Sequence, residues 1–145
     1  MARKINLKNE VFLDTSYAVA LSSPKDSWHQ KAVHLATQIK ATGTLMITTQ
    51  AVMLEIGNSL SKQHYRRAAV SLLYALEADP RIENIPLSKS LYDRAFQLYR
   101  NRMDKEWGLI DCVSFVVMSE HGITDALTAD IHFQQAGFRA LLCED

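Results

Sequence analysis

The sequence has few of the residues that mark specialised classes of protein. Of its 145 residues, two are cysteine, three are proline and five are glycine. Cys112 and Cys143 are too few for the disulfide framework of a small secreted domain, and with the scattered histidines they offer no paired spacing for a structural zinc site. Low proline and glycine contents, with 48% hydrophobic residues, exclude collagen-like and disordered chains. We therefore expect a globular protein of a reducing compartment, the cytoplasm.

Long hydrophobic stretches are also missing. No segment approaches the roughly eighteen uninterrupted apolar residues of a membrane-spanning helix. The first ten residues, MARKINLKNE, lack the apolar core of a signal peptide. The length is close to that of a typical single domain, so we expect one domain over residues 1–145 and no membrane partner.

Neither sign of charge is in excess, since 16 lysine and arginine residues balance 16 aspartate and glutamate residues. A neutral chain argues against a polyanionic partner, unless bound cations offset some of the carboxylates. If four acids belong to a metal site, sixteen basic residues face twelve remaining acidic ones. A nucleic-acid partner is therefore compatible with this composition only if such a site exists.

Short apolar strands alternate with helical patterns along the chain. The predicted strands span residues 11–13, 44–48, 82–85, 123–127 and 138–142, and helical periodicity is clear at 28–39, 50–62, 65–77, 88–99 and 112–118. This alternation predicts an α/β fold, with a central, mainly parallel sheet of four to five strands flanked by helices.

Acidic residues follow two of the predicted strands. Asp14 comes directly after the first strand, and Asp130 follows the fourth after Thr128 and Ala129. In an open parallel sheet, ligands bind beyond the carboxyl ends of the strands. Each aspartate could instead cap the helix that follows it, so neither is diagnostic alone.

Two further acids lie in apolar surroundings. Glu55 occurs within AVMLEIGNSL at 51–60, where a carboxylate needs a partner unless it belongs to a solvated helix stripe. Asp111 opens the most apolar helix, or is simply an acid at a helix start. A helix of about eleven residues and a returning strand of about five residues both cover roughly 16 Å, which brings Asp111 back near Asp130. Such a carboxylate cluster calls for a divalent cation.

Four segments together resemble the PIN domain family, and in particular VapC-type toxins of toxin–antitoxin pairs. They are VFLDTS at 11–16, EIGN at 55–58, DKEWGLIDCVSF at 104–115 and LTADIHF at 127–133. The resemblance covers essentially the whole chain. It implies a PIN-like fold and a ribonuclease dependent on Mg²⁺ or Mn²⁺, with RNA as substrate, a cognate antitoxin as partner and a homodimer as assembly.

The resemblance also implies roles for individual residues. Asp14, Glu55, Asp111 and Asp130 would be the catalytic, metal-binding acids. Asn58 and Thr128 would be supporting polar groups, and Asp104 an accessory acid. One departure is Ile110, where similar proteins often have Ser or Thr, which removes a possible helix-capping hydroxyl.

Two basic runs lie near proposed metal ligands in the sequence, one around Lys62, Arg66 and Arg67 and the other around Arg102 and Lys105. Runs of this kind are usually solvated helix faces, but a nuclease must also hold a polyanion beside its acidic centre. We take these five residues as candidate RNA contacts.

Single residues near the motifs favour structural roles. Trp107 is expected to pack rather than to stack on a base, His132 to lie at the surface of a short helix, and Cys112 to be an inert core residue. The excess apolar surface of the helices between residues 65 and 99 also favours a homodimer.

Other functions fit the residues less well. A haloacid-dehalogenase-type phosphatase needs a second aspartate two residues after the first, where this chain has Ser16. Walker-type and GxSxG motifs are missing, which disfavours a nucleoside triphosphatase and an α/β-hydrolase. A non-catalytic RNA-binding or scaffold module of the same fold remains the alternative to a ribonuclease.

Overall fold

A five-stranded parallel sheet forms the centre of the computed structural model, which describes residues 4–145. The strand order is β3-β2-β1-β4-β5, and every neighbouring pair is parallel. The strands are β1 (Glu10–Leu13), β2 (Leu45–Thr49), β3 (Ile82–Ile85), β4 (Asp125–Leu127) and β5 (Arg139–Ala140). The predicted α/β fold with a mainly parallel sheet is confirmed.

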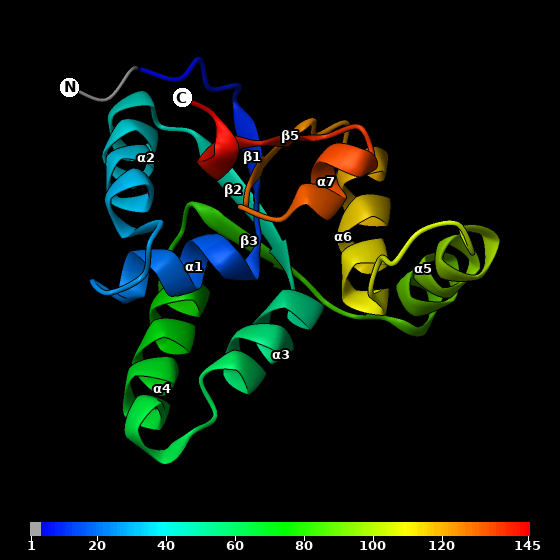
Figure 1. Cartoon of the computed structure of the whole chain (residues 1–145), viewed down its shortest axis with the longest axis horizontal. Helices are drawn as coiled ribbons and strands as arrows, with labels where there is room; N and C mark the ends of the chain where they lie inside the picture. Colours follow the sequence, from blue (N-terminus) through cyan, green and yellow to red (C-terminus); the bar gives the residue numbers. More distant parts are fainter. Residues whose placement is uncertain (1–3) are drawn as a thin grey trace.

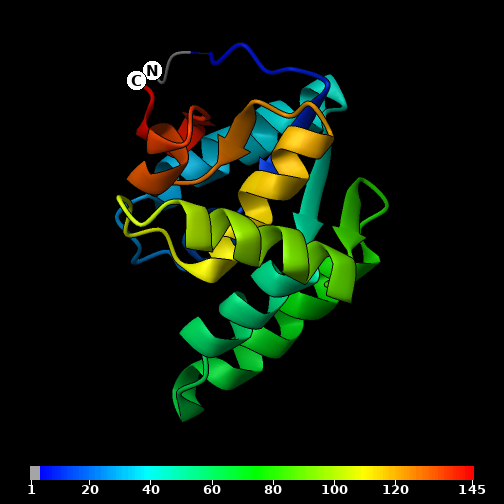
Figure 2. The same ribbon diagram turned by 90° about the vertical axis from the view of Figure 1, so that its right-hand side faces the viewer.

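Seven helices connect the strands and cover the two faces of the sheet. They are α1 (Thr15–Ser22), α2 (His29–Thr42), α3 (Gln50–Ser59), α4 (Gln63–Ala78), α5 (Lys89–Asn101), α6 (Leu109–Glu120) and α7 (Ile131–Gln135). α1, α2 and α4 lie on one side of the sheet, whereas α5, α6 and α7 lie on the other (Figure 1). The pair formed by α3 and α4 extends beyond the end of β2 (Figure 2).

The strand order reverses beside β1. The chain steps from β1 to β2 to β3 in one direction, then crosses the sheet to β4 on the other side of β1. The crossover helices consequently change face, which opens a crevice outside the carboxyl ends of β1 and β4. This switch point is where a ligand site is expected in any sheet of this kind.

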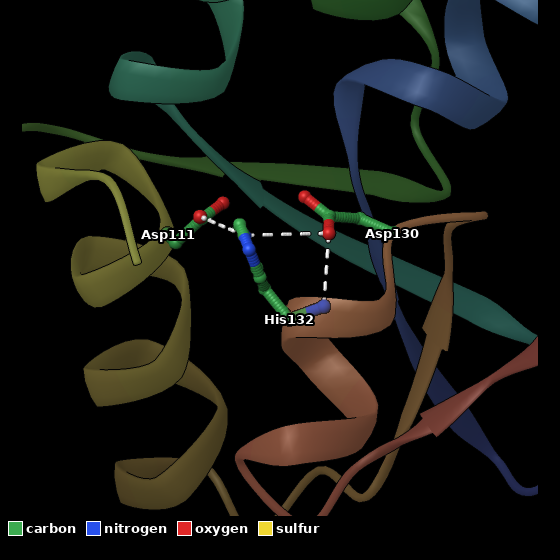
Figure 3. A group of neighbouring side chains, drawn as sticks. All are labelled: Asp111, Asp130 and His132. Carbon is green, nitrogen blue, oxygen red and sulfur yellow. Dashed lines mark hydrogen bonds and ion pairs between the residues drawn. The ribbon is translucent and has the colours of Figure 1, made fainter. Parts of the chain in front are cut away.

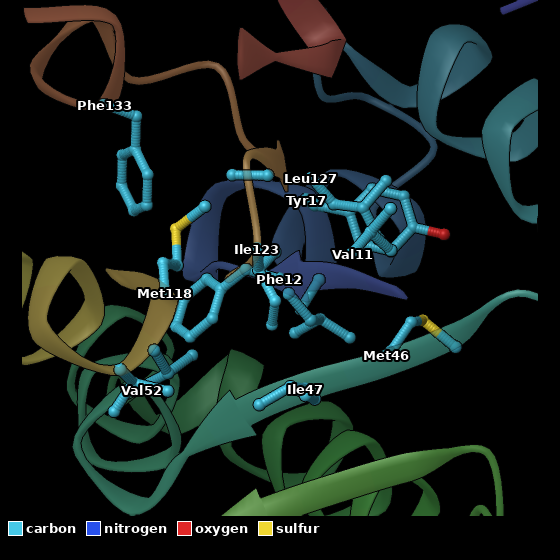
Figure 4. Close-up of a cluster of buried hydrophobic side chains, with 14 of the residues drawn as sticks. Val11, Phe12, Tyr17, Met46, Ile47, Val52, Met118, Ile123, Leu127 and Phe133 are labelled. Atoms are coloured by element: carbon cyan, nitrogen blue, oxygen red, sulfur yellow. The ribbon is translucent and has the colours of Figure 1, made fainter. Parts of the chain in front are cut away.

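The core is continuous through the sheet (Figure 4). Val11, Phe12 and Leu13 are at most 1% exposed, so both faces of β1 are covered. α6 is apolar nearly all round because it packs against both the sheet and α5. Tight packing on both sides holds the ends of β1 and α6 in a fixed relation.

The last two strands are shorter than the sequence pattern predicts. β4 begins at Asp125 rather than 123, and β5 ends at Ala140 rather than 142, because Leu141–Cys143 forms the 3₁₀ helix η1. The Leu142 N–H donates to the carbonyl of Thr128 at 3.1 Å. The chain end therefore turns back over the segment that follows β4 and fixes its backbone.

Asp125 is a buried charge at the start of β4. It is 1% exposed and pairs with the Arg139 guanidinium of β5 at 3.2 Å. The same guanidinium donates to Glu144 at 2.6 Å and to the carbonyl of Asn6 at 3.1 Å. Arg139 thus joins β4, the segment before β1 and the C-terminal residues.

No helix within residues 4–145 has both the length and the apolar character needed to cross a membrane.

Replacing Arg139 by methionine should lower the free energy of unfolding by about 3 kcal/mol, because the buried Asp125 carboxylate loses its counter-charge. Urea denaturation followed by circular dichroism measures this loss. The double variant Asp125→Asn/Arg139→Met should recover part of it, since no unpaired charge remains buried. A single variant within about 0.5 kcal/mol of wild type would show that the ion pair does not stabilise the fold.

Candidate metal centre

Asp14 lies at the carboxyl end of β1 and is 5% exposed. The Thr128 hydroxyl donates a hydrogen bond of 2.7 Å to its Oδ2 atom. Asp14 also precedes α1 as the N-cap residue, but its side chain makes no capping hydrogen bond. Its carboxylate interacts with the backbone of Thr15 and with the charges of Glu55 and Asp111, so it belongs to the same centre as these acids.

A network of hydroxyl groups fixes the backbone after β4. Thr128 Oγ1 accepts a hydrogen bond from the Asp130 N–H at 3.0 Å, and Ser16 Oγ accepts one from the Ala129 N–H at 3.0 Å. The two hydroxyl oxygens are 3.1 Å apart. Ser16, which the sequence distinguishes only as the residue that replaces a phosphatase aspartate, thus joins α1 to the loop that carries Asp130.

Asp111 belongs to the first turn of α6. Its Oδ2 atom accepts a hydrogen bond from the Gly108 N–H at 3.1 Å, so the carboxylate both satisfies the helix end and faces the crevice. Gly108, not Ile110, is the N-cap residue. The absence of a hydroxyl at position 110 therefore removes no cap from this helix.

Asp130 and His132 meet Asp111 across the crevice (Figure 3). Asp130 caps α7, because its Oδ1 atom accepts from the His132 N–H at 2.9 Å. The His132 Nδ1 atom is 3.1 Å from Asp111 Oδ2 and 3.4 Å from Asp130 Oδ1. Ligand atoms of these three residues lie within 4.8 Å of one another. His132 lies on the short helix α7, as expected, and is 28% exposed, but its ring points into the cluster of acids rather than only toward solvent.

Glu55 reaches the same centre from α3 and is half-buried. Burial raises the pKa of its carboxyl, and the negative charges of Asp111 and Asp130 raise it further, while the Thr15 hydroxyl opposes the shift. Four elements of the fold thus bring the four predicted acids, Asp14, Glu55, Asp111 and Asp130, within electrostatic reach of one another.

The arrangement is unfavourable for free carboxylates. Burial raises the pKa of Asp14 to about 7, against the hydrogen bond from Thr128, and the charges of Glu55 and Asp111 add to the rise. Burial also raises the pKa of Asp111, although the Gly108 N–H stabilises its charged form. The electrostatic repulsion between these acids favours either a proton or a cation in the centre.

The donor set fits a divalent cation. Carboxylate oxygens are the ligands that hard divalent ions prefer. Asp111 and Asp130, with His132, already place ligand atoms within 4.8 Å of one another, and the charges of Asp14 and Glu55 act on the same centre. Thr15 is buried beside Glu55, and its hydroxyl stabilises the charged form of that carboxylate.

Two other predicted site residues lie outside the cluster. Asn58, one turn beyond Glu55 on α3, is exposed and makes no hydrogen bond to the acids within the described chain. Asp104 instead pairs with Arg102 through contacts of 2.9 and 3.0 Å. That guanidinium holds the pKa of Asp104 at about 2. Thr128, by contrast, contacts Asp14 directly.

The candidate RNA contacts divide into two groups. Lys62, Arg66 and Arg67 are exposed where α4 begins. Arg102 and Lys105 are half-buried, and Asp104 neutralises part of their charge, with its carboxylate 4.0 Å from the Lys105 ammonium. The first group is therefore the more available for phosphate.

The structural interpretations of Trp107 and Cys112 are confirmed. Trp107 is 6% exposed, packs edge-on against Phe115 and donates its Nε1–H to Gln135 at 3.1 Å. Cys112 is fully buried in α6, and burial raises the pKa of its thiol to about 11. Neither side chain is available for chemistry.

Comparison with known proteins agrees with this geometry. The model of the PIN domain family matches residues 11–139, and the chain therefore belongs to the PIN domain family. It is 29% identical over 129 residues to the 23S rRNA-specific endonuclease VapC20 of Mycobacterium tuberculosis, in strains CDC 1551 / Oshkosh and ATCC 25618 / H37Rv. That match covers 88% of this chain and 95% of the relative, so the chain is a homologue of a VapC-type endonuclease.

Two solved structures share the fold. The crystal structure of Mycobacterium tuberculosis VapC20, described as a sarcin-ricin loop cleaving toxin, superposes with a TM-score of 0.77 at 26% identity over 88% of this chain and 95% of that one. VapBC2 from Rickettsia felis, bound to a DNA fragment from its promoter, gives 0.64 at 16% identity over 90% and 96%. The resemblance to PIN domains predicted from the motifs is confirmed.

Asp14 should make the metal-free protein less stable as the pH rises. Its folded-state pKa of about 7 exceeds the ordinary value of 3.8, so between these values the folded state binds more protons than the unfolded chain. Stability therefore falls as the pH rises through this window. In a chelator at pH 7.5, Asp14→Asn should be more stable than wild type by roughly 2–4 kcal/mol.

Urea unfolding at pH 5 and pH 7.5 measures this effect. The advantage of Asp14→Asn should shrink at pH 5, where wild-type Asp14 carries its proton. The same advantage at both pH values would contradict the raised pKa. Asp93→Asn, on the exposed face of α5, is the matched control and should show no such dependence.

Proposed function

We propose that this protein is a divalent-metal-dependent endoribonuclease that uses Mg²⁺ or Mn²⁺, and that it is the toxin of a toxin–antitoxin pair. The observation that supports this most is the meeting of four carboxylates at the switch point of a PIN domain. They come from the end of β1, from α3, from the start of α6 and from the loop after β4. A structural ion pair or a helix cap does not require four acids in one place.

Each acid has a distinct part in the proposed reaction. Asp14, Asp111 and Asp130 would hold the ion, and Glu55, less deeply buried, would ligate it directly or through water. When bound, the ion would lower the pKa of a water molecule that attacks the phosphodiester and would stabilise the charge that develops on the phosphate. Thr128 holds Asp14, and Ser16 holds the loop of Asp130. No side-chain nucleophile is needed.

RNA is proposed as the substrate because the homologous VapC20 is specific for 23S rRNA. The exposed cations Lys62, Arg66 and Arg67 lie together where α4 begins, beyond the end of the helix α3 that carries Glu55, and would contact phosphates of the bound RNA. We propose these residues as RNA contacts ahead of Arg102 and Lys105. Contacts between these cations and phosphates do not depend on the base sequence, so they do not determine which RNA sequence is cut.

An antitoxin and a second copy of the chain are the proposed protein partners. Tyr74, Tyr92, Phe96 and Tyr99 are between 42% and 71% exposed on α4 and α5. Burial of such aromatic surface is the usual driving force for obligate association. Homodimerisation and a cytoplasmic location remain predictions from the sequence.

Asp14→Asn should reduce RNA cleavage by about 100-fold or more, because the amide keeps the shape of the carboxylate but loses the charge that holds the ion. Cleavage of a labelled RNA in Mn²⁺ is the measurement, and circular dichroism checks the fold. Asp93→Asn, an exposed acid on α5, controls for loss of charge alone and should cleave normally. Equal rates for wild type and Asp14→Asn would refute the proposed centre.

Expression of the chain without a partner should slow the growth of a bacterial host, because an unrestrained ribonuclease attacks essential RNA. Growth curves and the integrity of total RNA are followed after induction, with Asp14→Asn expressed at the same level as the control. Normal growth and intact RNA in the presence of wild-type folded protein would exclude a toxin.

A further inference from the structure

The proposed reaction leaves His132 without a role, although its ring lies between two of the acids. The side chain is 28% exposed and contacts both Asp111 and Asp130 through Nδ1. Figure 3 shows the ring projecting from α7 into the space between them. An ionised carboxylate can only accept a hydrogen bond, so the contacts to ionised Asp111 and Asp130 require the Nδ1–H tautomer of the ring.

The spacing of the three groups suits shared coordination. Two ligand atoms that are each about 2.1 Å from one zinc ion are about 3.0–3.4 Å apart for angles between a right angle and the tetrahedral value. Nδ1 of His132 lies 3.1 Å from Oδ2 of Asp111 and 3.4 Å from Oδ1 of Asp130. Nδ1 can therefore share one ion with either carboxylate oxygen once the ring proton moves to Nε2, and the three ligand atoms together lie within 4.8 Å of one another.

We propose that His132 is a nitrogen ligand and that Asp111, Asp130 and His132 bind Zn²⁺ in preference to Mg²⁺. Imidazole is a ligand for zinc and neighbouring transition ions, whereas Mg²⁺ takes oxygen ligands and water. Three protein ligands with one open position are typical of zinc sites that exchange water or substrate. Resting on the proposed function, this site would let Zn²⁺ displace Mg²⁺ and so stop cleavage.

The variant His132→Asn separates ligation from simple hydrogen bonding. The asparagine amide nitrogen occupies nearly the position of Nδ1 and can donate to both carboxylates, but it has no lone pair for a metal. His132→Ala removes both functions. His121→Gln removes an imidazole on the exposed end of α6, away from the acids, and is the matched control.

Calorimetric titration of the full chain with Zn²⁺ and, separately, with Mg²⁺ at neutral pH tests the proposal. Wild type and His121→Gln should bind Zn²⁺ at least about 10-fold more tightly than Mg²⁺. His132→Asn should lose at least about 10-fold in Zn²⁺ affinity, because loss of a residue that only orients a metal ligand already costs about that much. Its Mg²⁺ affinity should not change. The visible spectrum of bound Co²⁺ should change in the same variant.

Zn²⁺ affinity that survives in His132→Asn would overturn the proposal. Equal losses for both metals would also overturn it, because they would show that His132 only positions the acids. RNA cleavage in Mg²⁺ is assayed separately on the same samples. If wild type cleaves no RNA but binds Zn²⁺ through His132, the metal site stands and the proposed ribonuclease function fails.

Discussion

Electrostatic repulsion among carboxylates at one edge of the sheet is the constraint on which the rest of the structure depends. Asp14 is almost completely buried, and the negative charges of Glu55 and Asp111 act on it in the same direction as its burial. Buried like charges are unstable without a proton, a counter-ion or strong hydrogen bonds. The surrounding residues supply some of these bonds, and a cation would supply the missing positive charge.

The parallel topology explains why such a cluster can be built at all. β1 and β4 are neighbours although more than 100 residues separate them in the chain, and both end at the switch point. Residues after these two strands therefore meet without any local sequence relation. The helix end at Asp111 and the cap at Asp130 add backbone N–H groups that partly stabilise the two charges.

Hydrogen bonds and ion pairs outside the four acids fix the backbone around the centre. Ser16 and Thr128 link α1 to the loop after β4, and the Leu142 N–H fixes the Thr128 carbonyl. Arg139, on β5, joins this strand to β4 through Asp125 and to the C-terminal residues through Glu144. The loop after β4 carries Asp130 and also makes these stabilising contacts. The stability of the fold and the geometry of the centre are therefore coupled.

Much of this arrangement could be predicted from the sequence, because it follows from local patterns. Short apolar strands followed by Asp14 and Asp130 already indicate two acids at one sheet edge. The uniformly apolar helix after Asp111 indicates a central element, and its length returns the chain to the same edge. These features depend on hydrophobic periodicity and on the geometry of parallel strands, which a single sequence contains.

Other features depend on contacts that no local pattern records. The ring of His132 points inward because Asp130 caps α7 through the His132 N–H and so sets the rotation of the helix. Ser16 meets Ala129 across 113 positions of the chain. Asp104 resembles an accessory acid in its motif, but the adjacent Arg102 binds it in a two-pronged ion pair. In each case several hydrogen-bond or ion-pair partners compete for one side chain, and the folded structure decides which of them it contacts.

The central claim is that the four acids together form one divalent-metal centre. Diffraction from crystals soaked in Mn²⁺, with an anomalous difference map, tests it most directly because the map locates the ion without assuming its ligands. The account predicts a strong peak between the carboxylates of Asp14, Asp111 and Asp130, and the loss of that peak in Asp14→Asn crystals. A map that is flat at this position in saturating Mn²⁺, with ordered density for the three side chains, would contradict the account.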